Sequence, residues 1–157
     1  MINIPGEAIL FDMYYATVDP VALAGEKKTA VKTTVPPVTE ETPQLKNFYI
    51  KNIVTKGASK GIFLRGLPEM NIQHIWIENA ILEAHKGIEI IEAAQVNLKN
   101  ITLKTTENNP LIAINNSTAI NLDNIQALDA PELYIEVAGK KSNNINLSKS
   151  NTRTAKT

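Results

Sequence analysis

The 157-residue sequence contains no cysteine, few aromatic residues (5%) and no net charge. Without cysteine there can be no disulfide, thiolate metal site or cysteine nucleophile. The 16 basic and 16 acidic residues balance, which argues against nucleic-acid binding and against a polybasic membrane patch. No run of about 18 apolar residues is present, so no membrane-spanning helix is expected. Residues 1–7 resemble no secretory signal and leave the localisation undetermined.

Glycine and proline, the usual turn residues, are also scarce, with 7 and 8 copies. Asparagine and isoleucine are in surplus instead, with 17 and 20 copies. Isoleucine suits the packed surface of a β-sheet. Asparagine tolerates the left-handed backbone region that many turns require, so it can take the place of glycine. This composition indicates an unusual β-structure with asparagine at its turns.

A short phrase, apolar-x-Asn-apolar, recurs along the chain. Its clearest copies are residues 50–53, 77–80, 98–101 and 122–125. The asparagines in these copies are 27, 21 and 24 residues apart. Between the copies lie short alternating apolar runs rich in isoleucine, which are typical of strands. Repeats of this length, built from strands, indicate a solenoid.

The sequence therefore predicts an all-β fold, a right-handed single-stranded parallel β-helix of about five coils over residues 1–147. Equivalent positions of successive coils would stack at the strand spacing of about 4.8 Å. Isoleucine would fill inward columns, and parallel crossovers are almost always right-handed. Side-chain amides stacked in this way can form a hydrogen-bonded ladder. The residues predicted for this structural ladder are Asn52, Asn79, Asn100 and Asn124.

Two segments interrupt the pattern. Residues 16–44 are rich in Pro, Thr, Lys and Glu and have no apolar period, so they are predicted to form a long loop excursion within the first coil. Loops of this length are usually functional or disordered. Residues 148–157 are polar and are predicted to form a frayed tail.

Residues 7–15, 48–54 and 61–70 together resemble the C-terminal coils of bacterial polygalacturonase-like enzymes, the pectinases of glycoside hydrolase family 28. The resemblance covers about residues 4–100; beyond them only the coil pattern continues. The resemblance implies a parallel β-helix and a pectin-type polysaccharide as ligand. For the parent family it implies inverting hydrolysis of galacturonide bonds, by proteins that are typically exported or periplasmic.

The catalytic motifs of that family are Asn-Thr-Asp, Asp-Asp, Gly-His-Gly and Arg-Ile-Lys, and none occurs in this sequence. Inverting hydrolysis needs an acid and a base about 6.5–9.5 Å apart, and the sequence suggests no such pair. No catalytic residue is therefore assigned. The chain is interpreted as a non-catalytic, C-terminal β-helix portion of a polygalacturonase-like glycoside hydrolase, inactive in isolation.

Three residues are candidates for substrate binding. Tyr14 and Tyr15 follow the first predicted strand, and the resemblance places a tyrosine at this point beside a sugar subsite, with Tyr15 the closer equivalent. Arg65 is the best carboxylate partner among five candidate cations because its planar fork bonds both oxygens; the others are Lys51, Lys56, Lys60 and Lys86. Each could instead be an ordinary packing or solvent-facing residue.

Neither histidine, His74 or His85, has a second ligand at metal spacing, so no metal and no cofactor is expected. Two other functions stay open: a stand-alone carbohydrate-binding module and a structural or assembly module on the same fold. Uncapped coil edges would expose unpaired strands, and such edges favour association between chains. A homo-oligomer is therefore a further prediction.

Overall fold

The structure is a computed structural model that describes residues 1–14 and 35–152. Every named element in this part of the chain is a β-strand, and all strand pairs are parallel. No helix here is long and apolar enough to cross a membrane. The strands are β1 (Glu7–Asp12), β2 (Lys46–Arg65), β3 (Ile72–Ile91), β4 (Ala93–Thr105), β5 (Ile112–Asn115), β6 (Thr118–Ala127), β7 (Ile135–Ala138) and β8 (Asn143–Ser148).

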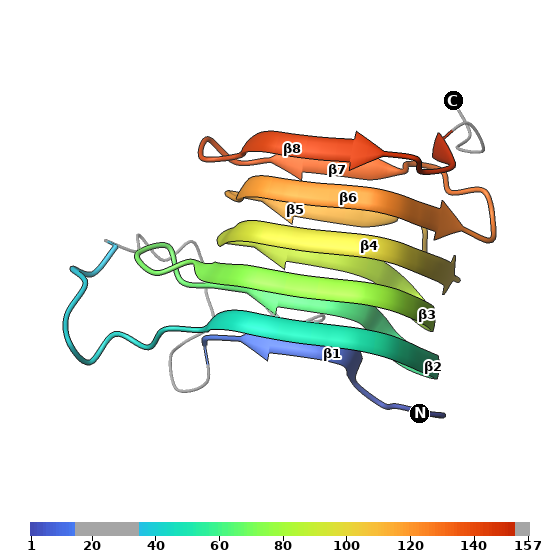
Figure 1. The fold of residues 1–157 in the computed structure, drawn as a ribbon, viewed down its shortest axis with the longest axis horizontal. Coiled ribbons are helices and arrows are strands. Elements are labelled where there is room, and N and C mark those ends of the chain that lie inside the picture. The colour runs from blue at the N-terminus through green and yellow to red at the C-terminus, as the bar shows by residue number, and fades with distance from the viewer. Residues whose placement is uncertain (15–34, 153–157) are drawn as a thin grey trace, which may run out of the picture.

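The chain winds into a flattened coil with two broad faces, and its two ends lie at opposite ends of the stack (Figure 1). We call one face the front sheet: the first parts of β2 and β3, followed by β4, β6 and β8. The other is the back sheet: β1, the last parts of β2 and β3, then β5 and β7. The predicted parallel β-helix is confirmed.

The coil makes about four complete turns, rather than the five predicted. Strands β2 and β3 each run through both faces and supply a full turn; β4 with β5, and β6 with β7, supply two more. Strands β1 and β8 cover only half a turn each, at the two ends. A count based on length alone includes these half-turns, which explains the difference.

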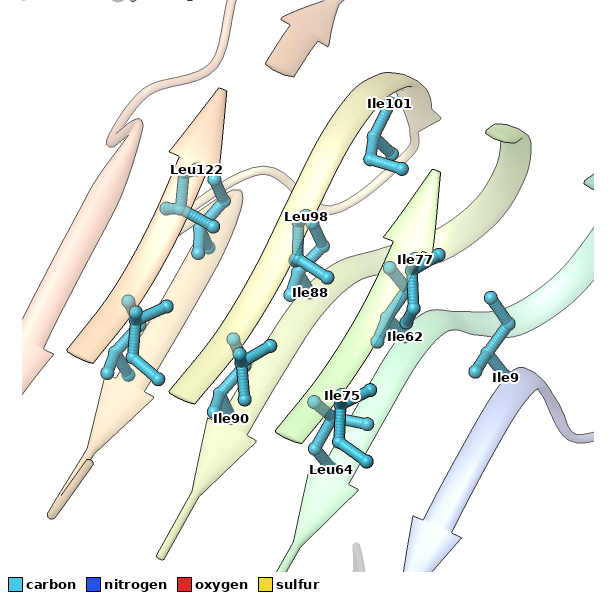
Figure 2. Close-up of a cluster of buried hydrophobic side chains, with 14 of the residues drawn as sticks. Ile9, Ile62, Leu64, Ile75, Ile77, Ile88, Ile90, Leu98, Ile101 and Leu122 are labelled. Carbon is cyan, nitrogen blue, oxygen red and sulfur yellow. The ribbon is translucent and has the colours of Figure 1, made fainter. Parts of the chain in front are cut away.

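The core consists of inward columns of aliphatic side chains between the two sheets (Figure 2). In the back sheet, Ile9, Ile62 and Ile88 occupy equivalent positions of successive turns, and Ile112 and Ile135 continue the column. Four of these five side chains are buried, and Ile135, at the end of the column, is partly buried. Burying such a side chain contributes about 1.5–3 kcal/mol, so the isoleucine columns are the main source of stability in the fold.

Left-handed backbone positions also recur in columns. Asn52, Asn79, Asn100 and Asn124 all have φ between 54° and 58°. Their side-chain amides form a ladder in which each Nδ2 donates to the Oδ1 of the preceding coil, at 3.2, 3.0 and 2.9 Å. A second left-handed column consists of Asn47, His74, Gln95, Ala119 and Asn144. Asparagine thus serves both the turn backbone and the contact between coils.

The loop and tail predictions concern segments that are only partly described. Of the predicted loop, residues 15–34 lie outside the described part, and residues 35–44 contain no strand. Of the predicted tail, Ser148 ends β8, and residues 153–157 lie outside the described part. Ser150 and Asn151 accept hydrogen bonds from the backbone N–H groups of β6, at 3.0 and 2.9 Å.

Candidate functional site: the outer face of the back sheet

Four of the side chains singled out from the sequence lie on or beside the outer surface of the back sheet: Tyr14, Lys60, Arg65 and Lys86. Because side chains alternate along each strand, every second residue of this sheet points outward. One outward column runs Leu10, Phe63, Glu89, Ala113, Glu136. We call the outer surface around this column the groove face.

Two adjoining hollows lie on the groove face, of about 200 and 190 Å³. Glu89 and Ala113 line both of them. The first hollow is also lined by Lys60, Lys86 and Glu107, and the second by Glu136. Small side chains at the centre keep the surface low, so the hollows form one shallow depression across the turns.

Gly87 explains how closely successive turns approach at this point. A Cβ atom on Gly87 would lie 2.1 Å from the carbonyl oxygen of Leu111 in the next turn. Only glycine allows that approach without moving the backbone. The floor of the first hollow therefore depends on this residue.

On the same sheet, Arg65 forms a two-pronged ion pair with Asp12, which lines the larger cleft described below and neither hollow. Arg65 Nε donates to Asp12 Oδ1 at 2.9 Å, and its NH2 group donates to Oδ2 at 2.5 Å. The Tyr14 backbone N–H donates to the same carboxylate at 3.0 Å. The Tyr14 ring lies 4.9 Å from the guanidinium carbon of Arg65, within the range of a cation–π contact.

The pKa of Asp12 lies below its ordinary value. Burial on its own would raise the pKa, because it disfavours the charged form, but the hydrogen bonds from Arg65 and Tyr14 and the charge of Arg65 outweigh it. Asp12 is therefore ionised at neutral pH and cannot serve as a general acid.

The other cations of the groove face are paired as well. Lys60 forms a short ion pair with Glu89 and lies 3.8 Å from the Phe63 ring centroid. Lys86 Nζ is 3.0 Å from Glu107 Oε1, and its side chain is 51% exposed. An exposed pair of this kind is weak, so Lys86 can exchange its partner for an anionic ligand at little cost.

The structure brings together two of the three residues proposed from the sequence for substrate binding. Tyr14 and Arg65 are in contact at one side of the groove face, and Tyr15 lies outside the described residues. The sequence reasoning missed Phe63, whose half-buried ring lies between Lys60 and Arg65. A lone phenylalanine among aliphatic strand residues gives no signal of an outward position.

In the described part of the chain, no group of three His, Cys, Asp or Glu side chains is placed to hold a metal ion. His85 Nε2 lies 3.3 Å from Glu107 Oε2 and its Nδ1 lies 2.6 Å from Thr106 Oγ1. His74 has a left-handed backbone conformation, with φ of 54°, and its ring stacks near Trp76.

A larger cleft of about 670 Å³ lies between residues 36–45 and the turn at Leu67 and Glu69. Its lining is mainly apolar and rich in proline, with Pro36, Pro37 and Pro43. Residues 36–45 continue directly from residues 15–34, which lie outside the described part. We therefore assign this cleft no function.

Comparisons of the chain with protein families, with curated proteins and with solved structures find no match. The parallel β-helix itself follows from the strand register alone.

Proposed function

We propose that this chain is a C-terminal, non-catalytic β-helix portion of a polygalacturonase-like glycoside hydrolase, and that its groove face binds a pectin-type polysaccharide. The observation that carries the proposal is the pair of adjoining hollows that cross several turns on one face, one of them lined by Lys60 and Lys86 beside Glu89 and Glu107. A repetitive groove suits a repetitive polymer, and ammonium groups suit the carboxylate of a uronic acid.

The charges of the groove face determine the kind of binding expected. Arg65, Lys60 and Lys86 each have a carboxylate partner already, so an acidic sugar must compete with that partner. The half-exposed Lys86 is the easiest to release. Binding is therefore expected to be weak and to decrease as salt is added, because exposed charge pairs are screened.

The absence of catalysis follows from the carboxylates that face the groove. Asp12 is held ionised by Arg65, and Glu89 is paired with Lys60. Glu89 and Glu136 line the same hollow from strands two levels apart, a Cα separation of about 9.6 Å at the ordinary strand spacing. Because Lys60 already binds Glu89, we assign these two carboxylates no acid–base role.

The test is a titration of oligogalacturonides into the protein, compared with neutral oligosaccharides. Lys86→Gln should raise the Kd by about two- to five-fold, the value of one exposed ion pair. Lys104→Gln is a matched control, because Lys104 is 53% exposed and is also paired, with Glu83, but lies outside the hollows. Equal effects of the two substitutions would contradict binding at the groove face.

Hydrolysis is tested separately by measuring reducing ends released from polygalacturonate. No release above buffer is expected. If release were found, the non-catalytic proposal would be wrong, and Glu89→Gln and Glu136→Gln would be the first variants to make, because these two carboxylates share a hollow.

A further inference from the structure

Two basic side chains share the carboxylate of Glu107 at the rim of the first hollow. Glu107 Oε1 lies 3.0 Å from Lys86 Nζ, and Glu107 Oε2 lies 3.3 Å from His85 Nε2. Lys86 and Glu107 line the hollow, whereas His85 is not part of its lining. On the basis of the proposed function, we propose that His85 makes the binding of an acidic polysaccharide depend on pH: when it gains a proton, it takes over Glu107 and releases Lys86 to the ligand.

The backbone holds these three residues together. His85 and Lys86 are consecutive residues of β3, at the corner where this strand passes from the front sheet to the back sheet. Glu107 belongs to the connection between β4 and β5, and its N–H donates to the carbonyl of His85 at 2.8 Å. Because this bond fixes the two backbones side by side, the carboxylate can change partner by a rotation of its side chain alone.

The ring of His85 lies in the orientation that its charged form needs. Its Nδ1 is 2.6 Å from Thr106 Oγ1, and its Nε2 faces the Glu107 carboxylate. A neutral imidazole donates from one nitrogen only, whereas the protonated ring donates from both. Gain of a proton makes the contact with Glu107 a charge-assisted hydrogen bond, which is about twice as strong as a neutral one.

The charge balance at the carboxylate changes with this proton. While His85 is neutral, Lys86 is the cation that neutralises Glu107. When His85 is charged, two cations face one carboxylate, so one positive charge at the rim is left for an anionic ligand. Lys86 supplies that charge, because its side chain lines the hollow and is half exposed. Binding should therefore strengthen as the pH falls from about 8 to about 5, the range in which histidines gain a proton.

The other charged side chains around His85 are carboxylates and ammonium groups, which as classes titrate near about pH 4 and about pH 10. Glu83 of β3 is paired with Lys104 of β4 at 3.5 Å. Lys60 of β2 is paired with Glu89 of β3. The remaining ones are Lys56 of β2, and Asp129 and Glu132 in the connection between β6 and β7.

The whole sequence contains only two histidines, so a change over this pH range can be assigned by substitution. The second one, His74, belongs to the front sheet and lines neither hollow. It lies in a left-handed backbone position that Gln95 occupies one turn later. His74→Gln therefore fits the backbone, and it serves as the matched control for His85→Gln.

The test is a calorimetric titration of an oligogalacturonide into the protein at about pH 7.5 and about pH 5.5, at constant ionic strength. The wild type and His74→Gln should bind about two- to five-fold more tightly at the lower pH, the value of one exposed charge pair. His85→Gln should show one Kd at both pH values, because it has no proton to gain. Lys86→Gln should also show one Kd, because the released cation is missing.

Two controls accompany these titrations. The methyl ester of the same oligogalacturonide has no carboxylate charge, so its affinity for the wild type should not change with pH. Circular dichroism at both pH values establishes that each variant is folded. The substituted side chains of His85 and Lys86 are 60% and 51% exposed, so neither replacement disturbs the core.

Each outcome bears on one of the two proposals. Saturable binding by the wild type with a single Kd, or weaker binding at the lower pH, would overturn the role of His85 and leave the proposed function intact. PH dependence that persists in His85→Gln, disappears in His74→Gln or extends to the methyl ester would overturn that role too, and its persistence in Lys86→Gln would overturn the exchange of partners. Absence of binding at both pH values would overturn the proposed function, and the role of His85 with it.

Discussion

The asparagine ladder allows a sharp prediction, because its central member combines two separable effects. Asn100 donates from Nδ2 to Asn79 at 3.0 Å and accepts from Asn124 at 2.9 Å. It also has φ of 54°, a left-handed conformation that an ordinary L-residue adopts at a cost of about 1–2 kcal/mol. Asparagine tolerates this conformation better than most residues, so replacement by alanine removes the hydrogen bonds and adds the backbone cost.

The magnitudes follow from these contacts. Each ladder bond is exposed, so its net value is near the lower limit for a hydrogen bond, about 0.5 kcal/mol. Asn100→Ala should therefore lower the free energy of unfolding by about 2–3 kcal/mol, the bonds and the backbone cost together. Asn100→Gly loses the same bonds but none of the steric cost, and after its larger entropy loss it should be about 1 kcal/mol less destabilising than alanine.

Asn97 is the matched control. It belongs to a second amide column and accepts from Asn121 Nδ2 at 3.0 Å, but it is not among the residues with positive φ. Asn97→Ala should therefore cost only about 0.5–1 kcal/mol. The assay is equilibrium urea unfolding followed by circular dichroism. If Asn100→Ala were no worse than Asn97→Ala, or if Asn100→Gly were no better than Asn100→Ala, the left-handed column would not be the reason for asparagine.

Two further predictions concern the core and the ion pair. Ile77→Ala should lower the free energy of unfolding by about 2–5 kcal/mol because Ile77 is fully buried. The control Ile81→Ala, on the exposed face, should change it by about 0.5 kcal/mol or less. Equal losses of stability in urea unfolding would contradict the inward columns. The pKa of Asp12 is lower in the folded state, so its ionised form stabilises the fold above its unfolded pKa, and this contribution is lost as the pH falls through the lowered pKa. The Asp12→Asn variant should accordingly be less stable than the wild type at neutral pH and lose less stability between about pH 5 and about pH 2. Parallel curves of unfolding free energy against pH for the two proteins would refute the pairing of Asp12 with Arg65.

The sequence was sufficient to predict the class of fold and the isoleucine columns, because both depend on repetition. The Asn52 column could be found by spacing, since one asparagine marks the same turn in each coil. The face occupied by a residue on the back sheet could not be found in this way. The strand register shifts between Thr55 and Ala58. Counting alternate residues from Asn52 therefore no longer tells which side chains point inward beyond that shift.

Pairs of side chains from successive turns can also be found only when the position of the register shift is known. Asn52 and Asn79 are 27 residues apart, but the coil partners Lys60 and Lys86 are 26 apart, on the other side of the register shift. The ion pair of Lys60 with Glu89 spans 29 residues. No constant repeat predicts such a pair, and the groove face therefore became visible only in three dimensions.

Isothermal titration calorimetry with an oligogalacturonide tests at once whether the groove face binds an acidic polysaccharide and whether it cleaves it. We expect a saturable heat of binding that decreases as salt is added, followed by a return to baseline after every injection. No saturable heat would contradict binding, and a sustained heat flow after injection, the sign of turnover, would contradict the absence of catalysis.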